Sequence, residues 1–387
     1  MNILHIASYY PSEKTMHAGG LAMGKEISTL KKLGHTVYTV SFVQKEYDFD
    51  IYQEDMDERH RCVILDKKRK ILNIIRHPFS PIEFATRFDN EFLAIIESMI
   101  SEYRIDAIHA EYSAMLWYTR IIKKHTDLKY VIVLHDVAVQ SYIRKAKNEK
   151  NILKKFLLTI EKNKIASFEK RMLKKCDEII SFSKKDNSLI KEEYGLESKY
   201  INTYFGLDKM EEKKEKYKRK NDDNFSVCFM GQMGRKENND AAIRLVSIFN
   251  KLQIDNKKLH VVGANPSDYL LRLEDEKIII TGFVDDIDKY VIENCDVACF
   301  PLETGAGIKI KVLEALAIGI PVLTNIIGAE GIDEKFDYII QANSDEEYVE
   351  QLEHVYRFND KVDFTEFLRE FDWSRNEAVF KELYGDV

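Results

Sequence analysis

Two lysines and a glutamate follow a glycine-bearing turn in the second half of the chain, and together they could bind an anion. These residues are Gly305, Gly307, Lys309, Lys311 and Glu314. Apolar residues at helical spacing predict a helix over Ile308–Ile318, which would begin directly at the glycines. The first turn of a helix presents unpaired N–H groups and a positive dipole, which favour an anion by roughly 0.3–1 kcal/mol.

Residue types in this order indicate a binding site for a nucleoside diphosphate. Glycines allow a phosphate to approach the backbone, and the two lysines add positive charge. A carboxylate about one turn later, at Glu314, can accept both hydroxyls of a ribose. A simpler interpretation stays open, because Lys311 and Glu314 are three residues apart and could form an ordinary surface ion pair.

Two strands expected in the first half end in histidines and carboxylates. The first carries His109 and Glu111, and the second ends in His135 and Asp136. Ligands of parallel sheets meet the carboxyl ends of the strands. We expect His135 to take part in chemistry ahead of His109 or Glu111, although a histidine at a strand end can equally be structural.

Strands and helices alternate in both halves of the chain, which is typical of parallel α/β sheets. The chain opens with a strand over Asn2–Ser8, a loop ending in Gly19–Gly20, a helix over Leu21–Leu33 and a strand over Thr36–Phe42. The last strand of the first half is expected at Glu178–Ser183. In the second half we expect strands at 225–230, 258–263, 277–281, 296–300, 322–324 and 338–341, and helices at 239–249, 345–357, 364–371 and 374–384.

Length and composition favour a globular protein of two domains. The chain has 387 residues, of which 45% are apolar and 32% charged. Its net charge of −7 argues against a nucleic-acid partner. No run approaches the roughly 18–20 apolar residues of a membrane span, and no signal peptide is expected. Five scattered cysteines are typical of reduced thiols in a cytoplasmic protein.

No metal site is expected from the sequence. Asp286 and Asp288 form an Asp-x-Asp pair, but they follow a strand at a place where a helix N-cap is expected, and Asp is favoured there. Cys295 and Cys299 lack further ligands at the spacing of a zinc site.

Two stretches are rich in lysine with interleaved apolar residues, at 59–77 and 144–175. Basic amphipathic helices can lie on an anionic membrane surface. Because acidic residues are mixed in, a solvated helix face is the other interpretation. Residues 206–224 are charged and nearly devoid of apolar side chains, which indicates a linker.

Two segments resemble one known family. GAGIKIKVLEALAIGIPVLT resembles the donor-binding segment of the retaining glycosyltransferases of family 4, also called group 1, and GGLAMGKEISTLKKLGHTVYTVSF resembles their first βαβ unit. The resemblance covers nearly the whole chain and implies the GT-B fold, which is α/β with two Rossmann-like domains facing a central cleft. It implies an N-terminal acceptor-side domain (1–205), a linker (206–224), a C-terminal nucleotide-sugar-binding domain (225–365) and a terminal helix (366–387) that crosses back.

The resemblance also implies roles for individual residues. His135 would lie beside the transferred sugar and act in catalysis, and His109 and Glu111 would lie on the acceptor side. Donor binding would fall to Gly19, Gly20, Arg235, Lys236, Gly305, Gly307, Lys309, Lys311 and Glu314.

Two positions depart from the family pattern. Ala306 stands where many members have a glutamate that touches the donor sugar, and Glu303 is near enough to replace it. Gln232 stands where an arginine is frequent, so that Arg235 and Lys236 are shifted along the chain.

The activity implied by the resemblance is transfer of a sugar from a nucleoside diphosphate sugar, UDP favoured, to an acceptor hydroxyl. Anomeric configuration would be retained, and neither a metal nor another cofactor is expected. The acceptor would be a carbohydrate, a lipid-linked glycan or a protein in bacterial cell-surface polysaccharide or glycoconjugate synthesis, and no nucleic acid is expected as a partner. The expected location is the cytoplasm, with contact to the inner face of the membrane as an option. A non-catalytic transferase-like subunit and a nucleotide-sugar epimerase are the alternatives.

Overall fold

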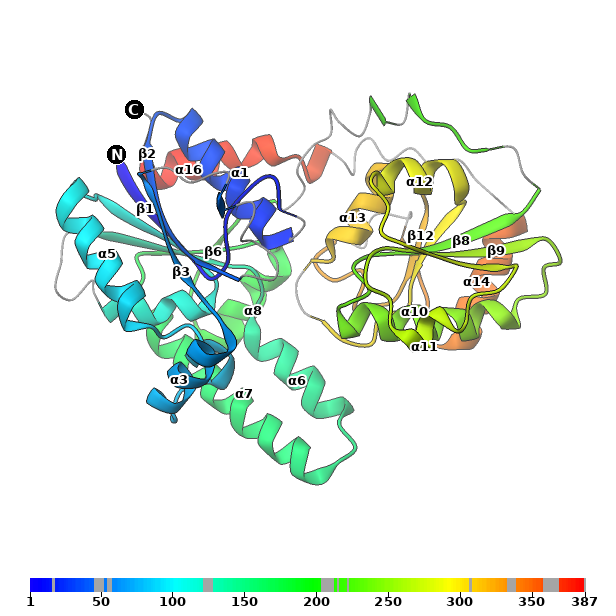
Figure 1. The fold of residues 1–387 in the computed structure, drawn as a ribbon, viewed down its shortest axis with the longest axis horizontal. Helices are drawn as coiled ribbons and strands as arrows, with labels where there is room; N and C mark the ends of the chain where they lie inside the picture. Colours follow the sequence, from blue (N-terminus) through cyan, green and yellow to red (C-terminus); the bar gives the residue numbers. More distant parts are fainter. Residues whose placement is uncertain are drawn as a thin grey trace. The chain divides into compact units, whose positions relative to one another are not determined.

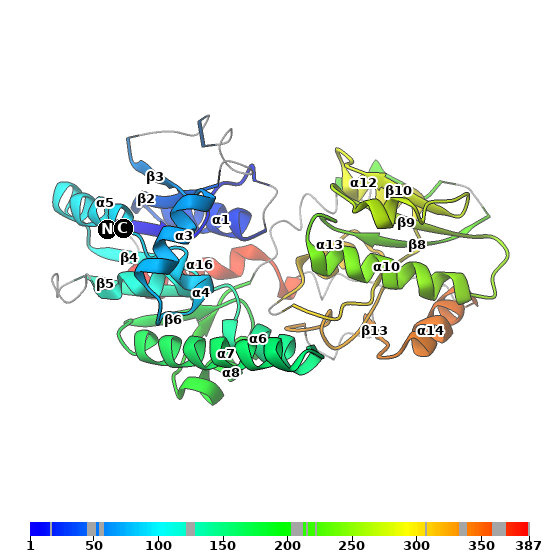
Figure 2. The same ribbon diagram turned by 60° about the horizontal axis from the view of Figure 1, so that its bottom comes forward.

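The computed structural model describes residues 1–15, 18–44, 52–53, 58–120, 128–202, 212–213, 216–220, 223–305, 308–332, 339–357 and 369–385. The chain divides into two compact units. Unit 1 comprises Met1–Phe205 together with Trp373–Val387, and unit 2 comprises Gly206–Asp372. Each unit is a parallel sheet with helices packed on both of its faces (Figures 1 and 2). The predicted α/β fold with two Rossmann-like domains is confirmed.

Unit 1 has a parallel sheet of seven strands among its described residues, in the order β3-β2-β1-β4-β5-β6-β7. The strands are β1 (Asn2–Ala7), β2 (Thr36–Val43), β3 (His60–Ile64), β4 (Ala107–Glu111), β5 (Lys129–Leu134), β6 (Glu178–Ser181) and β7 (Lys199–Tyr200). The strand order reverses between β1 and β4. The central strands are apolar and buried on both faces, as expected for a sheet covered by helices on two sides.

The helices of unit 1 include a long antiparallel pair, α6 and α7, that extends away from the sheet (Figure 1). The helical elements are α1 (Ala18–Lys32), α3 (Lys67–Arg76), α4 (Ile82–Ala85), α5 (Asn90–Tyr103), η1 (Ser113–Arg120), α6 (Ala138–Asn148), α7 (Ile152–Leu173), α8 (Lys184–Tyr194), η2 (Trp373–Arg375) and α16 (Asn376–Tyr384). The last two return the end of the chain to unit 1, where Trp373 Nε1 donates a hydrogen bond of 2.9 Å to Thr29 Oγ1.

Unit 2 repeats the arrangement with six strands in its described part, in the order β10-β9-β8-β11-β12-β13. The strands are β8 (Phe225–Met230), β9 (Lys257–Val262), β10 (Ile278–Gly282), β11 (Val297–Phe300), β12 (Val322–Thr324) and β13 (Ile339–Gln341), and the helices are α10 (Lys236–Lys251), α11 (Asp268–Leu271), α12 (Ile287–Asn294), α13 (Ile310–Ala317) and α14 (Asp345–Arg357). Here the order reverses between β8 and β11. Ligands of such sheets bind at the carboxyl ends of the strands beside this reversal.

Several sequence-based boundaries were wrong. Strand β3 lies within a stretch that we took as basic and amphipathic throughout, and the two-residue strand β7 extends the sheet beyond β6, which we expected to be the last. Helix α1 begins at Ala18, three residues before the expected start, because the loop in front of it packs on the helix. The described residues of the expected linker pair with unit 2: Arg219 Nε, for example, donates to Asp296 Oδ1 at 2.9 Å.

The expected N-cap at Asp286 is confirmed, because its carboxylate accepts a hydrogen bond from Lys289 N at the start of α12. No helix among the described residues has both the length and the apolar character needed to cross a membrane.

Candidate functional site

The helix α13 in unit 2 begins close to the carboxyl ends of β8 and β11. It starts at Ile310, two residues later than expected, so that Lys309 is its N-cap and Lys311 lies in its first turn. The side chain of Lys309 makes no capping hydrogen bond, and no other described residue is seen to cap this helix end. The positive end of α13 is therefore not neutralised by a carboxylate cap, which suits an anionic ligand.

Lys311 points back over the strands. Its ammonium lies 4.9 Å from the ring centroid of Phe229 on β8 and 5.8 Å from that of Phe300 on β11, and it donates a hydrogen bond to Asn238 Oδ1. A Cβ added to Gly231 would lie 3.2 Å from Lys311 Nζ. The ammonium therefore lies at the point where the strand order reverses, the usual ligand position of such a sheet.

The charge on Lys311 is poorly solvated. Burial, and secondly the positive charge of Arg235, lower its pKa to about 7. An anion placed beside it would restore the charged form, because opposite charges stabilise one another most where water is excluded.

Lys309 and Glu330 form an ion pair inside unit 2. Lys309 Nζ lies 3.4 Å from Glu330 Oε2, and both side chains are largely buried. Gly305, with a φ of +125°, lies so close that a Cβ on it would be 3.1 Å from Lys309 Cε. Glycine at 305 is thus required both by its backbone conformation and by the packing of Lys309.

Glu314 lies in the second turn of α13 and is half-buried. Burial, and secondly the charge of Asp288, raise its pKa to about 7. Glu314 and Lys311 are not an exposed surface pair, which was the alternative interpretation: both are at least half-buried, each charge shifts the pKa of the other, and the Lys311 ammonium donates to Asn238. Glu314 remains our candidate for the ribose.

Arg235 and Lys236 separate into two environments. Arg235 is the N-cap residue of α10, and its charge lowers the pKa of Lys311, so it lies near that ammonium. Lys236 is exposed and pairs with Asp240 on the outer side of the same helix. The charge of Arg235 therefore reaches Lys311, but its side chain is 61% exposed and pairs with Glu237 Oε1 at 2.6 Å.

The other glycines expected to bind the donor are Gly307, Gly19 and Gly20. Gly307, like Ala306, lies outside the described residues. Gly19 and Gly20 lie in the first turn of α1 and are buried. A Cβ on Gly20 would lie 2.4 Å from Thr15 Cγ2, so its small size is explained by the loop packed on the helix.

Unit 1 contains a buried network of histidines and glutamates beside the strand reversal between β1 and β4, called here the buried network. His109 Nε2 lies 2.8 Å from Glu26 Oε2 and 3.1 Å from Glu111 Oε1, and His135 Nε2 lies 2.8 Å from Glu111 Oε2. His5 Nε2 lies 3.2 Å from Glu111 Oε1. The members of the network are His5, Glu26, His109, Glu111, His135 and Tyr384.

His109 and Glu111, which the resemblance assigns to the acceptor side, are wholly buried. His135 is the member that reaches solvent, with an 11% exposed side chain, and its ring stacks on Tyr112 at 3.7 Å between centroids. Glu111 therefore holds the His135 ring, and His109 in turn contacts Glu111.

In the buried network, the pKa values of both His109 and Glu111 are raised. Burial lowers the pKa of His109, but Tyr384, Glu111 and Glu26 outweigh it, and the pKa lies well above its usual value. Burial, and secondly the charge of Glu26, raise the pKa of Glu111. The carboxylate of Glu111 fixes the orientation of the His135 ring through its Nε2 atom.

Three members of the buried network could also hold a metal ion by geometry. One ligand atom each from His5, His109 and Glu111 lies within 4.8 Å of the others. Both ring nitrogens of His109 already have protein partners, since Nδ1 contacts the Tyr384 hydroxyl at 2.7 Å. Hydrogen bonds within the protein thus account for His109, whereas the buried atoms His5 Nδ1 and Glu26 Oε1 have no hydrogen-bond partner among the described residues.

Sequence reasoning missed Asn238, Glu330, Glu26 and Tyr384. Asn238 had no signal because it lies 73 residues from Lys311, and Glu330 had none because it lies beyond the strand that follows α13, outside any helical spacing with Lys309. Glu26 did have a signal in the sequence. It lies four residues after Ala22 and four before Leu30, on the buried stripe of α1, and a carboxylate in that position requires a partner.

Comparison with known families covers most of both units. Residues 27–203 match the model described as Glycosyltransferase Family 4, and residues 224–357 match the model described as Glycosyl transferases group 1. No curated protein matches the chain.

Solved structures match along the whole length. Sucrose-phosphate synthase from Thermosynechococcus elongatus has a TM-score of 0.69 at 14% identity, with 99% of this chain and 98% of that chain covered. Anabaena HepE in complex with UDP has a TM-score of 0.65 at 14% identity over 100% of both chains. The lipopolysaccharide outer core galactosyltransferase WaaB has a TM-score of 0.62 at 12% identity, covering 98% and 100%. At these identities the likeness establishes the fold, and the GT-B prediction is confirmed.

Proposed function

We propose, from the premise that this chain belongs to the group 1 glycosyltransferases, that it transfers a sugar from a nucleoside diphosphate sugar to an acceptor hydroxyl. One observation carries the proposal: Lys311, Lys309 and Arg235 gather at the uncapped start of α13, beside the reversal of strand order in unit 2. Three cations and a helix N-terminus form a binding site for a diphosphate.

The proposed donor contacts follow from this arrangement. The diphosphate lies at the start of α13 against Lys309 and Lys311, and Glu314 accepts the ribose hydroxyls. UDP is the favoured nucleotide, supported by the likeness to a fold that was solved with UDP bound. Gly307 belongs to the same segment but lies outside the described residues.

The proposed reaction breaks the bond between the anomeric carbon and the diphosphate oxygen, and forms a bond from that carbon to the acceptor oxygen. The acceptor proton passes to the departing diphosphate. Lys309, Lys311 and the α13 dipole stabilise the charge that grows on the leaving group, which is the role a metal ion has in other transferases. We propose retention of configuration on the basis of the family resemblance.

His135 is the proposed contact to the transferred sugar in unit 1. It is the solvent-reaching end of the buried network, and Glu111 and Tyr112 hold its ring. A ring fixed in this way can donate to or accept from a sugar hydroxyl without rearranging.

A panel of UDP-, GDP- and ADP-sugars tests the proposal. Slow release of nucleoside diphosphate, accelerated by an acceptor, supports transfer, and the anomeric signal of the product in proton NMR tests retention. Interconversion of the sugar without an acceptor would indicate an epimerase, and no donor binding would indicate a non-catalytic subunit.

Lys311→Met should abolish the donor-induced rise in Tm, whereas Lys251→Met, at the exposed far end of α10, should preserve it.

The acceptor is proposed to be a carbohydrate, a lipid-linked glycan or a protein of cell-surface polysaccharide or glycoconjugate synthesis. A lipid-linked acceptor would place the enzyme at the inner face of the membrane.

A further inference from the structure

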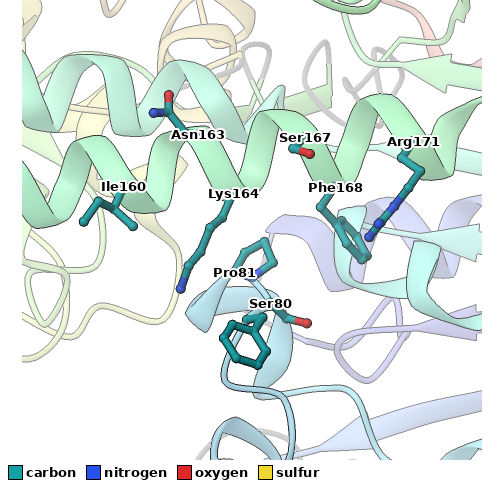
Figure 3. Close-up of a pocket in the computed structure, with 9 residues that line it drawn as sticks. Ser80, Pro81, Ile160, Asn163, Lys164, Ser167, Phe168 and Arg171 are labelled. Carbon is teal, nitrogen blue, oxygen red and sulfur yellow. The ribbon is translucent and has the colours of Figure 1, made fainter.

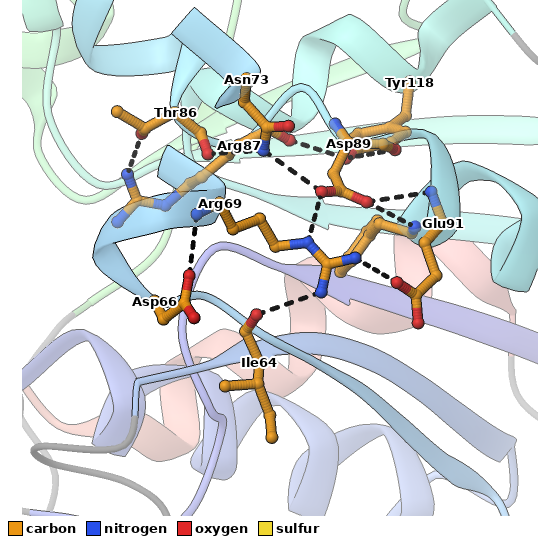
Figure 4. A network of polar contacts seen from close by, with 10 residues as sticks. Ile64, Asp66, Arg69, Asn73, Thr86, Arg87, Asp89, Glu91 and Tyr118 are labelled. Carbon is orange, nitrogen blue, oxygen red and sulfur yellow. Dashed lines mark hydrogen bonds and ion pairs between the residues drawn. The ribbon is translucent and has the colours of Figure 1, made fainter. Parts of the chain in front are cut away.

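Helix α3 in unit 1 turns two polar residues, Arg69 and Asn73, inward beside Ile74 and leaves its other three apolar residues exposed. Arg69 Nε donates to Asp89 Oδ2 at 2.8 Å, and the fully buried Asn73 donates to the same oxygen at 3.2 Å (Figure 4). Ile71 and Ile75 are exposed, Ile75 to 68%. This is the reverse of an ordinary surface helix, whose apolar stripe faces the core.

The polar anchors fix this orientation of α3. Asp66 caps the helix by accepting from Arg69 N, and Asn73 also donates to Thr86 O at 3.1 Å (Figure 4). Turning the apolar residues inward would break these buried hydrogen bonds, at a cost of about 1–3 kcal/mol for each unsatisfied group. The outward apolar face is therefore built into the fold.

A second exposed apolar stripe runs along α7. Ile152 is 83% exposed and Phe156 is 63% exposed, and Ile160 continues the line at the same spacing of four residues. Leu153 and Leu157 lie beside it and are also exposed. Because residues four apart lie on the same side of a helix, these side chains form one continuous strip.

The α7 strip leads into a hollow of about 440 Å³. Phe79 (92% exposed) and Pro81 line one side of it, and Lys164 and Arg171 on α7 line the other. Figure 3 shows Lys164, Phe168 and Arg171 projecting from α7 toward the turn that contains Pro81. The hollow thus joins the apolar strip to two cations.

Basic residues surround these apolar residues, although the whole chain is acidic. Helix α3 contributes Lys67, Lys68, Lys70 and Arg76 and contains no acidic residue, whereas Arg69 is turned inward and paired with Asp89 and Glu91. The start of α7 carries Lys154 and Lys155 beside the exposed strip, and no acidic residue lies in its first turn. Against a net charge of −7, this positive charge is concentrated on one part of unit 1.

We propose that this part of unit 1 is a docking surface for an anionic phospholipid bilayer. The surface, called here the α3–α7 face, consists of Ile71, Leu72, Ile75, Phe79, Ile82, Ile152, Leu153, Phe156 and Leu157 with the lysines and arginines around them. The apolar side chains enter the boundary between head groups and acyl chains, and the cations meet the lipid phosphates. Arg171 holds one phosphate at the hollow, beside Lys164, which is paired with Glu161 at 3.0 Å.

The chemistry of the α3–α7 face favours a bilayer over a protein partner. Protein interfaces are depleted in lysine, whereas lysines flank the apolar residues here. Each lysine near an anionic membrane contributes about 1 kcal/mol, and large apolar side chains add to this. The surface lies in a different unit from Lys311, so vesicle binding and donor binding are measured independently.

Flotation of the full chain with vesicles tests the proposal at about 0.15 M salt. Vesicles of phosphatidylcholine with roughly 30% phosphatidylglycerol should bind the protein at least tenfold more tightly than vesicles of phosphatidylcholine alone. The double variant Ile152→Ser, Phe156→Ser should lose at least tenfold in affinity. Lys154→Glu with Lys155→Glu should lose affinity for the anionic vesicles, and the remaining binding should depend less on salt, because fewer cations meet the lipid phosphates.

Matched variants in unit 2 serve as controls. Phe283, which is 57% exposed, is changed to Ser, and Lys251 is changed to Glu; both should keep vesicle binding. All variants carry changes at exposed positions, and an unchanged Tm and donor-induced shift verify folding. Equal binding to neutral vesicles, absence of binding, an equal loss in the controls, or a dimer that the Ile152→Ser, Phe156→Ser variant abolishes would each overturn the proposal.

Discussion

Donor binding should depend on pH in a way that two residues of α13 dictate. Lys311 has a pKa lowered to about 7 by burial and by Arg235, so its ammonium is lost as pH rises through 7. Glu314 has a pKa raised to about 7 by burial and by Asp288, so its carboxylate appears over the same interval. A diphosphate requires the ammonium and a ribose prefers the carboxylate, and affinity should therefore pass through a maximum near neutrality.

A variant that removes the ionisation of Glu314 shows the effect of Lys311 on donor affinity, and a variant that removes the ammonium of Lys311 shows the effect of Glu314. Glu314 helps to raise the pKa of Lys311, so in Glu314→Gln that pKa lies below about 7 and the charged fraction of Lys311 falls by at least about tenfold between pH 6 and pH 8. If the bound donor keeps Lys311 charged, affinity should be at least about tenfold weaker at pH 8, which is about 1.4 kcal/mol or more. In Lys311→Met, binding should be weaker throughout and should strengthen as the pH rises.

Isothermal titration calorimetry with a nucleotide sugar measures this directly, since the esterified diphosphate has no ionisation of its own between pH 6 and 8. At pH 8 the Glu314→Gln protein should take up nearly one proton on binding, seen as a dependence of the heat on the ionisation enthalpy of the buffer. Lys311→Arg serves as a control, because its charge does not titrate there. Equal affinity of Glu314→Gln at pH 6 and 8, with no proton uptake, would refute the placement of Lys311 against the diphosphate.

Three further outcomes are expected. Lys309→Met should lower the free energy of unfolding by about 3 kcal/mol in urea titrations, because it leaves the buried Glu330 carboxylate unpaired. The double variant Lys309→Met, Glu330→Gln should recover most of that loss, and no recovery would contradict the ion pair. His135→Ala should reduce kcat by roughly 100-fold with little change in donor Kd, and a fully active variant would remove His135 from the reaction. Treatment with EDTA should change neither turnover nor Tm, whereas a loss restored by zinc would show that the buried network holds a metal.

The sequence alone determined the two parallel sheets and the segment that begins α13. Buried parallel strands are short apolar runs, and the glycine turn, lysines and glutamate of α13 are close together in the sequence, so local pattern suffices for both. It also marked residues 59–77 and 144–175 as basic and apolar, without deciding which side of each helix faces outward.

Tertiary structure decided which of these side chains meet. Lys311 is paired with Asn238, 73 residues away, and His109 with Tyr384, 275 residues away, and no local periodicity encodes such contacts. Lys236 and Arg235 are neighbours in sequence, yet only Arg235 approaches Lys311, because successive residues at a helix start point in different directions. Asp89 likewise holds Arg69 and Asn73 inward, and this buried carboxylate, together with Thr86 O, explains why Ile71 and Ile75 of α3 face outward.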